Sequence, residues 1–311
     1  MLKYKHIHFT EVFKDIKEDF LSLFPDSLEG YLNSREDVLE NMDIFSENCR
    51  SISLEKKDKS FNLFKKVKKV SSGTVVVIGF YLELFMYKGR PDLIIKTLGH
   101  YSNLYKDNIV IAYYNHDVDF ASLNHLVKDF SNLKILNFNT SKKSDQDILL
   151  HPFSINQNYI KKEKKHRYGF IGNITHPLRN YLVNSFHGCG DFFHTSGLSY
   201  THYLETLSEI SYNFCPRGAG LSSYRFYECF HLNTIPVLFS DKIPLPYADL
   251  IDYDKVSIRL SIEDALSQRR VKTSCSLLDE EKTQEHIRSV SHFFTFKGMQ
   301  TYLYNEFKNT T

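Results

Sequence analysis

The chain has 311 residues, a length that predicts about two domains, each large enough to bury its own core. Hydrophobic residues make up 42% and charged residues 24%, which excludes a largely disordered chain. The 39 Lys and Arg residues nearly balance the 37 Asp and Glu residues, and the net charge of +2 predicts no nucleic-acid partner.

The cysteines and the apolar runs indicate the cellular compartment in which the protein is expected. Five cysteines are an odd number, are widely spaced and include no Cys-x-x-Cys pair, which disfavours a disulfide framework and a zinc site. No apolar run approaches the roughly 20 residues that cross a bilayer, and the first residues lack the apolar core of a signal peptide. We therefore expect a cytoplasmic protein.

The first element with a clear pattern covers residues 54–70. Phe61, Phe64 and Val67 recur at helical spacing among lysines that extend from Lys56 to Lys69. This pattern predicts an amphipathic helix that is docked on the core with its lysines in solvent. Peripheral contact of this basic helix with an anionic membrane is the alternative.

Strands and helices then alternate along the chain. Apolar, β-branched runs predict strands at 74–79, 108–114, 133–139 and 147–153, and helical periodicity predicts helices at 90–102 and 122–130. Such strands, separated by helices, indicate a parallel sheet covered on both faces. We expect residues 1–159 to form an N-terminal Rossmann-like domain.

A charged stretch at 160–167 is expected to link this domain to a second one, or to be a solvated turn. The alternation resumes with strands at 167–173, 211–215, 234–239 and 255–260, and with helices at 177–186, 203–210 and 222–232. We expect a second Rossmann-like domain over 160–279. The segment 280–311, with a helix over 280–307, is expected to pack back on the N-terminal domain.

The junction after the strand at 211–215 carries the clearest chemical signal. The strand ends at Cys215, a loop with Gly218 and Gly220 follows, and Ser222 or Ser223 caps the next helix. Such a junction presents unpaired backbone N–H groups and a positive helix end to an anion.

Charged residues surround this junction. Arg217 lies in the loop and Arg225 in the first helical turn, and two guanidinium groups suit a diphosphate. Glu228 lies on the same helix face as Arg225, where a carboxylate would take ribose hydroxyls. The alternative is a surface ion pair between Arg225 and Glu228. The loop after the next strand brings Asp241 to the same sheet edge.

Four motifs follow one another in this part of the chain: Cys215-Pro216-Arg217-Gly218, Ser223-x-Arg225-x-x-Glu228, Ile235-Pro236-Val237 and Asp241-x-Ile243-x-Leu245-Pro246-Tyr247. They resemble the donor-binding half of exostosin-family glycosyltransferases, over about 165–262, and Arg179 is a further match. The resemblance implies the GT-B architecture, in which two doubly wound α/β domains face each other across a cleft. Residues 1–159 would then lie on the acceptor side, and 160–279 would bind a nucleotide-diphosphate sugar.

The resemblance implies that Arg217 and Arg225 hold the diphosphate and that Glu228 holds the ribose. We expect an inverting transfer from a UDP-linked sugar to a glycan, a polysaccharide or a lipid-linked saccharide. Single displacement needs a stabilised leaving group and a general base. Arg217, Arg225 and the helix N-terminus serve the first need. Asp117 is our candidate base, with alternatives at His116, Asp119, His151 and His176.

Other functions stay open. Asp117 and Asp119 form an Asp-x-Asp pattern that could bind Mn²⁺, which makes a metal-dependent glycosyltransferase an alternative. We expect no required cofactor or metal, because the arginines already neutralise the diphosphate. A non-catalytic nucleotide-sugar-binding subunit is the second alternative. A different Rossmann-type nucleotide enzyme is disfavoured, because no Gly-x-Gly-x-x-Gly follows an early strand.

Overall fold

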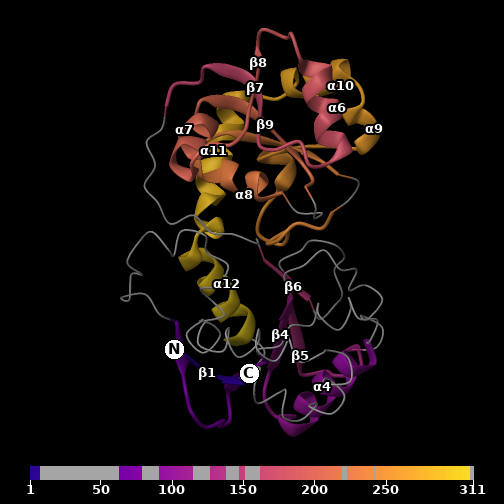
Figure 1. Cartoon of the computed structure of the whole chain (residues 1–311). Coiled ribbons are helices and arrows are strands. Elements are labelled where there is room, and N and C mark those ends of the chain that lie inside the picture. The colour runs from indigo at the N-terminus through magenta and orange to yellow at the C-terminus, as the bar shows by residue number, and fades with distance from the viewer. Residues whose placement is uncertain are drawn as a thin grey trace. The chain divides into compact units, whose positions relative to one another are not determined.

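A computed structural model describes residues 1–7, 63–78, 91–114, 127–137, 147–150, 162–218, 223–240 and 243–308. These residues form two compact units (Figure 1). Unit 1 consists of Met1–Leu150 together with Met299–Thr311, and unit 2 consists of His151–Gly298. The corresponding boundaries expected from the sequence lie after residues 159 and 279.

Unit 1 contains a parallel sheet of six strands in the order β2-β1-β3-β4-β5-β6. Its strands are β1 (Leu2–Ile7), β2 (Phe64–Lys66), β3 (Thr74–Ile78), β4 (Val110–Tyr114), β5 (Leu133–Asn137) and β6 (Asp147–Leu149). The whole of β3 is buried, as its run of β-branched residues predicts for a strand covered on both faces.

The prediction of a helix over 54–70 is wrong in its described part. Residues 64–66 form the edge strand β2, because residues 63–67 complete the hydrogen-bond ladder of β1. The amide of Leu2 donates to the carbonyl of Leu63 at 2.9 Å, and that of Val67 donates to Tyr4 at 2.8 Å. Pairing with β1 thus overrides the helical spacing of the apolar residues. Residues 54–62 lie outside the described residues, and exposed lysines are typical of an edge strand.

Two helices of the described chain belong mainly to unit 1: α4 (Pro91–Leu104) and α12 (Phe296–Lys308). The buried residues Met299, Leu303 and Phe307 recur every four positions along α12, so one stripe of this helix packs on the core.

The helix expected over 280–307 is interrupted. It consists of α11 (Glu280–Val290), the 3₁₀ turn η3 (Ser291–Phe294) and α12. Thr295 has extended backbone angles between the turn and α12, and its hydroxyl accepts a hydrogen bond from the amide of Gly298 at 2.9 Å. This threonine therefore ends one helical segment and caps the next.

Unit 2 contains a parallel sheet of five strands in the order β11-β10-β9-β7-β8. These strands are β7 (His166–Ile171), β8 (Phe192–Thr195), β9 (Ile210–Pro216), β10 (Ile235–Phe239) and β11 (Ile258–Leu260). β8 is not predicted from the sequence, because this short edge strand has no run of β-branched residues.

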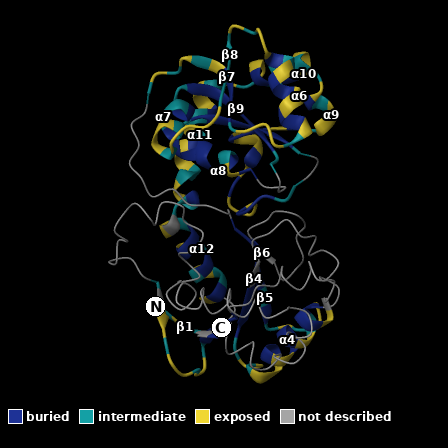
Figure 2. Ribbon diagram, in the orientation of Figure 1, coloured by how far each residue is buried: buried dark blue, intermediate teal, exposed yellow. Residues whose placement is uncertain are grey.

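Helices cover both faces of this sheet (Figure 1). On one side lie α6 (Pro177–Phe186), α9 (Ile262–Ala265) and α10 (Gln268–Ser276). On the other side lie α7 (Tyr200–Ser208), α8 (Tyr224–His231) and α11, and η2 (Tyr253–Lys255) precedes β11. Phe214 of β9 packs on Phe186 of α6 with 4.9 Å between ring centroids. β9 and β10 are buried over their full length (Figure 2).

The two described sheets confirm the expected α/β class with two doubly wound parallel units. The stretch expected to be a linker is part of unit 2 instead, since residues 166 and 167 begin β7. The Lys164 ammonium donates to the carbonyls of Ser208 and Ile210, at 3.0 Å each. The charged residues thus bind the end of α7 and the start of β9.

No helix among the described residues is long and apolar enough to cross a membrane.

Candidate functional site

Three arginines meet where β7 and β9 end. Arg179 comes from α6, Arg217 follows β9, and Arg225 lies in the first turn of α8. Arg179 is only 8% exposed. Its Nε donates to the carbonyl of Arg217 at 2.9 Å, and its Nη1 donates to the carbonyl of Asn173 at 3.0 Å. The buried guanidinium therefore joins the loops that follow the two strands.

Arg225 is held in a similar way. Its Nε donates to the carbonyl of Ile171, the last residue of β7. The ring of Phe170 lies beneath both guanidinium groups, with its centroid 5.0 Å from Cζ of Arg225 and 5.6 Å from Cζ of Arg179. Backbone carbonyls and an aromatic face thus fix the positions of two like charges.

The electrostatics of this pair favour an anion. Burial and the nearby charge of Arg225 lower the pKa of Arg179 to about 10. Neither Arg179 nor Arg225 forms an ion pair with a carboxylate of the described residues. Positive charge that is partly desolvated and not neutralised by a carboxylate attracts a negatively charged ligand.

Two glycines make room for these side chains. A Cβ built on Gly218 would lie 2.6 Å from Nη2 of Arg179. A Cβ on Gly172, where φ is +149°, would lie 2.8 Å from Cζ of Arg225. Gly218 was predicted as a residue of the loop after the strand at 211–215, and in the structure its lack of a side chain allows a guanidinium group to approach the backbone.

The N-terminus of α8 lies beside the arginines. Ser223 occupies the N-cap position with extended backbone angles, as expected, but its side chain makes no capping hydrogen bond. The Ser223 hydroxyl is buried and has no hydrogen-bond partner among the described residues. This buried hydroxyl therefore keeps capacity to bind a ligand, and it lies at the positive end of the α8 dipole.

Glu228 is buried on α8, with 2% of its surface exposed. Its Oε2 accepts a hydrogen bond from the hydroxyl of Tyr203 on α7. The alternative of a surface ion pair with Arg225 is wrong, because Arg225 binds the Ile171 carbonyl instead. Tyr203 is not predicted from the sequence, since no spacing signal connects residues 25 positions apart on different helices.

His176, one of the alternative bases, lies at the N-cap of α6. Its Nδ1 accepts a hydrogen bond from the amide of Leu178 at 3.2 Å. Burial, together with the charges of Arg217 and Arg179, lowers the pKa of His176 below its usual value. The imidazole therefore caps a helix beside the arginines and stays neutral at pH 7.

Several predicted residues cannot be placed. Gly220, Ser222 and Asp241 lie outside the described residues, as do all other candidates for the base: His116, Asp117, Asp119 and His151. Within the described ranges, no three His, Cys, Asp or Glu side chains gather in a cluster that could hold a metal ion.

Comparison with known proteins gives a match over residues 106–275 to the family model described as the Exostosin GT47 domain. The match covers more than half of the chain, including the strands and helices that carry Arg179, Arg217 and Arg225.

Curated relatives match over shorter segments. The Exostosin-1 homolog of Caenorhabditis elegans is 33% identical over 88 residues, which are 28% of this chain and 23% of that protein. The probable glycosyltransferase At3g07620 of Arabidopsis thaliana is 29% identical over 75 residues, 24% of this chain and 15% of that protein. The chain therefore matches less than a quarter of the length of either relative.

Two solved structures are similar at low sequence identity. The pneumococcal O-GlcNAc transferase GtfA, solved with UDP and GlcNAc, has a TM-score of 0.45 at 8% identity, over 77% of this chain and 57% of that one. A point mutant of TarM of S. aureus, solved with fondaparinux, alpha-GlcNAc-glycerol and UDP, has a TM-score of 0.44 at 10% identity, over 77% and 56% of the two chains.

Proposed function

Because the chain belongs to the exostosin GT47 family, we propose that it is a glycosyltransferase that uses a nucleotide-diphosphate sugar as donor. The observation that carries this proposal is the pair Arg179 and Arg225. These guanidinium groups are anchored by backbone carbonyls, pair with no described carboxylate and lie at the carboxyl edge of a parallel sheet. Ligands of such sheets bind at this edge.

The proposed reaction is a single displacement. The oxygen of an acceptor hydroxyl forms a bond to the anomeric carbon of the sugar. The bond from that carbon to the diphosphate oxygen breaks, and its electron pair leaves with the nucleoside diphosphate. Attack from the opposite face inverts the anomeric configuration. Arg217, Arg225 and the N-terminus of α8 stabilise the charge that develops on the leaving group.

The remaining roles are also proposals. We assign the general base to Asp117, which takes the proton of the acceptor hydroxyl, with Asp119, His116, His151 and His176 as alternatives. In the proposed GT-B arrangement the acceptor, a glycan, polysaccharide or lipid-linked saccharide, binds on the N-terminal side. The donor is proposed to be UDP-linked, and a cytoplasmic location stays a prediction.

We propose that no metal is required. The alternative is a metal-dependent transferase in which Asp117 and Asp119 bind Mn²⁺. Loss of turnover in EDTA that Mn²⁺ restores would establish this alternative, whereas turnover that persists in EDTA supports catalysis by the arginines alone.

A thermal-shift screen tests the donor site. The wild-type protein is melted with UDP, GDP, CMP and dTDP sugars, since a ligand that binds the folded state raises the melting temperature. One nucleotide class should stabilise the wild type, and Arg225→Ala and Glu228→Ala should both reduce the shift. Arg269→Ala is the matched control, because Arg269 is an exposed residue of α10. Equal shifts in all four proteins would refute the site.

The second candidate is a non-catalytic subunit that binds the nucleotide sugar for a partner enzyme. All three arginines lie in unit 2, so this unit alone could bind the nucleotide sugar, which supports the second candidate. Hydrolysis of the donor by the isolated chain, lost in Asp117→Asn, would exclude this candidate.

A further inference from the structure

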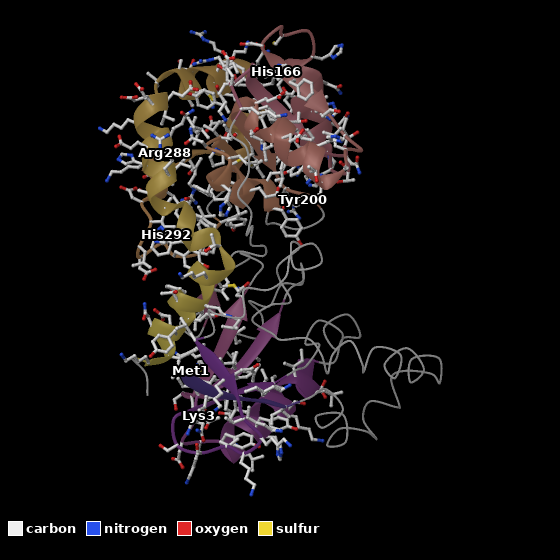
Figure 3. All side chains as sticks on the ribbon, turned by 90° about the vertical axis from the view of Figure 1, so that its left-hand side faces the viewer. Met1, Lys3, His166, Tyr200, Arg288 and His292 are labelled. Atoms are coloured by element: carbon white, nitrogen blue, oxygen red, sulfur yellow. The ribbon has the colours of Figure 1, made fainter. Side chains whose placement is uncertain are left out.

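Tyr203 and Glu228 link two helices on the same face of the unit 2 sheet. Tyr203 lies on α7, and its hydroxyl donates to Oε2 of Glu228 on α8. Tyr200 lies at the start of α7 (Figure 3). Its ring stacks beside that of Tyr203 with 6.1 Å between ring centroids. The stacked neighbour restricts the phenol ring, so its hydroxyl stays directed at the carboxylate.

The buried carboxylate depends on such a donor. Removing a carboxylate from water is costly unless hydrogen bonds replace its hydration. Burial raises the pKa of the Tyr203 phenol well above its usual value, and the charge of Glu228 adds to this increase. The phenol therefore keeps its proton throughout the neutral pH range and remains a hydrogen-bond donor.

The hydrogen bond from Tyr203 also sets the direction of the Glu228 carboxylate. A donor fixed on Oε2 restricts rotation of the carboxyl group of Glu228, and so it also sets where Oε1 points. Arg225, three residues earlier on α8, is held independently by the carbonyl of Ile171. Arg225 and Glu228 thus have separate hydrogen-bond partners, which keep these two charged groups of one helix face from pairing with each other.

We propose that Tyr203 is a positioning residue that directs Glu228 at the ribose hydroxyls of the donor and thereby makes the site selective for ribonucleoside over 2′-deoxyribonucleoside diphosphates. This inference rests on the proposed function and on the ribose-binding role of Glu228 that the family resemblance implies. A 2′-deoxy nucleotide lacks one of the hydroxyls that Glu228 would bind, so it loses a hydrogen bond to this buried carboxylate and binds less tightly.

Calorimetric titration tests the inference. UDP, GDP and their 2′-deoxy forms are titrated into the wild type, Tyr203→Phe and the control Tyr212→Phe. The control also removes a buried tyrosine hydroxyl, one that donates to the carbonyl of Cys275 at 3.0 Å on the side of the sheet that α10 covers. For the nucleotide that binds more tightly, the wild type should prefer the ribose form by roughly tenfold or more.

In Tyr203→Phe this preference should fall to roughly threefold or less, with the affinity for the 2′-deoxy form unchanged. Tyr212→Phe should keep the wild-type ratio. A wild type without preference, a Tyr203→Phe variant with the wild-type ratio, or equal weakening of both forms would overturn the role of Tyr203 and leave donor binding intact. If the wild type binds none of the four nucleotides and no sugar of the thermal-shift screen stabilises it, the proposed function itself fails, whereas stabilisation by a dTDP sugar alone would overturn the ribose selectivity.

A second measurement needs no variant, in case Tyr203→Phe does not fold. In a crystal structure of the wild type with the bound nucleotide, Glu228 should contact the ribose while Tyr203 still donates to Oε2. A Tyr203 hydroxyl that has left Glu228, or a ribose bound away from this carboxylate, would overturn the inference.

Discussion

Gly172 and Arg225 approach so closely that a Cβ on the glycine would lie 2.8 Å from Cζ of the arginine, and closer still to Nη2. The arginine cannot easily move away, because its Nε is bound to the carbonyl of Ile171. The end of β7 and the first turn of α8 are therefore held together. Gly172 has no side chain, and its backbone sets the position of the Arg225 guanidinium group.

Gly172→Ala should consequently displace Arg225. We expect the affinity for the nucleoside diphosphate to fall by roughly tenfold or more, since the charge-assisted bonds of this arginine are lost. Titration of UDP or GDP measures the effect. Gly190→Ala is the control, because a Cβ there would meet nothing within 4 Å. Wild-type affinity in Gly172→Ala would show that Arg225 does not depend on this contact.

Arg179→Lys tests whether geometry or charge matters at the buried arginine. Lysine keeps the charge but cannot reproduce the bonds to the carbonyls of Arg217 and Asn173. We expect the free energy of unfolding to drop by about 1–3 kcal/mol, because carbonyl groups lose their donors, and the donor affinity to drop as well. Urea unfolding and titration measure the two effects, and Arg269→Lys is the exposed control. Unchanged donor affinity would mean that charge alone suffices.

Lys164→Met should destabilise unit 2 without changing the donor site. Its ammonium binds the carbonyl of Ser208, the last residue of α7, and the hydroxyl of Thr234, at 3.0 Å each. Removing it leaves these acceptors unsatisfied, and we expect a loss of about 2–3 kcal/mol in urea unfolding. Lys165→Met, which removes an exposed ion pair with Glu209, should cost less than about 1 kcal/mol. Similar losses in the two variants would contradict the anchoring role of Lys164.

His231 should make stability depend on pH. Burial lowers the pKa of His231 to about 4, although its Nε2 lies 3.1 Å from the carbonyl of Phe294. Between pH 4 and about 6.5 the unfolded chain therefore binds a proton that the folded chain does not. The stabilising contribution is complete above pH 6.5 and is lost as the pH falls toward 4.

Urea unfolding of the wild type and His231→Gln measures this contribution. From pH 7 to pH 4.5, the unfolding free energy of the wild type should fall by about 2–3 kcal/mol more than that of the variant. His187→Gln, at an exposed position, should follow the wild type. Parallel curves for the wild type and His231→Gln would contradict a buried, neutral imidazole.

The local sequence pattern was sufficient to predict many helices and strands of unit 2. Residues 177–186 form α6 as predicted, because a proline at its first position and helical spacing of Leu178 and Leu182 agree with each other. β10 is a strand because its apolar run is short and bounded by polar residues. The sequence also predicts that Arg217 and Arg225 flank one strand-to-helix junction, and the structure places Arg217 after β9 and Arg225 in the first turn of α8.

Other features depend on contacts between distant parts of the chain. Residues 64–66 form a strand because they pair with β1, although the apolar residues in this part of the chain recur at helical spacing. Arg179 reaches the loop after β9, and Tyr203 reaches Glu228, across 38 and 25 residues of sequence.

The sequence alone therefore determined the α/β class and most of the described strands and helices, and it located the junction after β9 that carries Arg217 and Arg225. Only the tertiary structure decided which groups hold the arginines and the glutamate. The physical reason is that periodicity and capping act within a few residues, whereas the partners of buried polar groups are set by strand order and helix packing, which bring distant residues together.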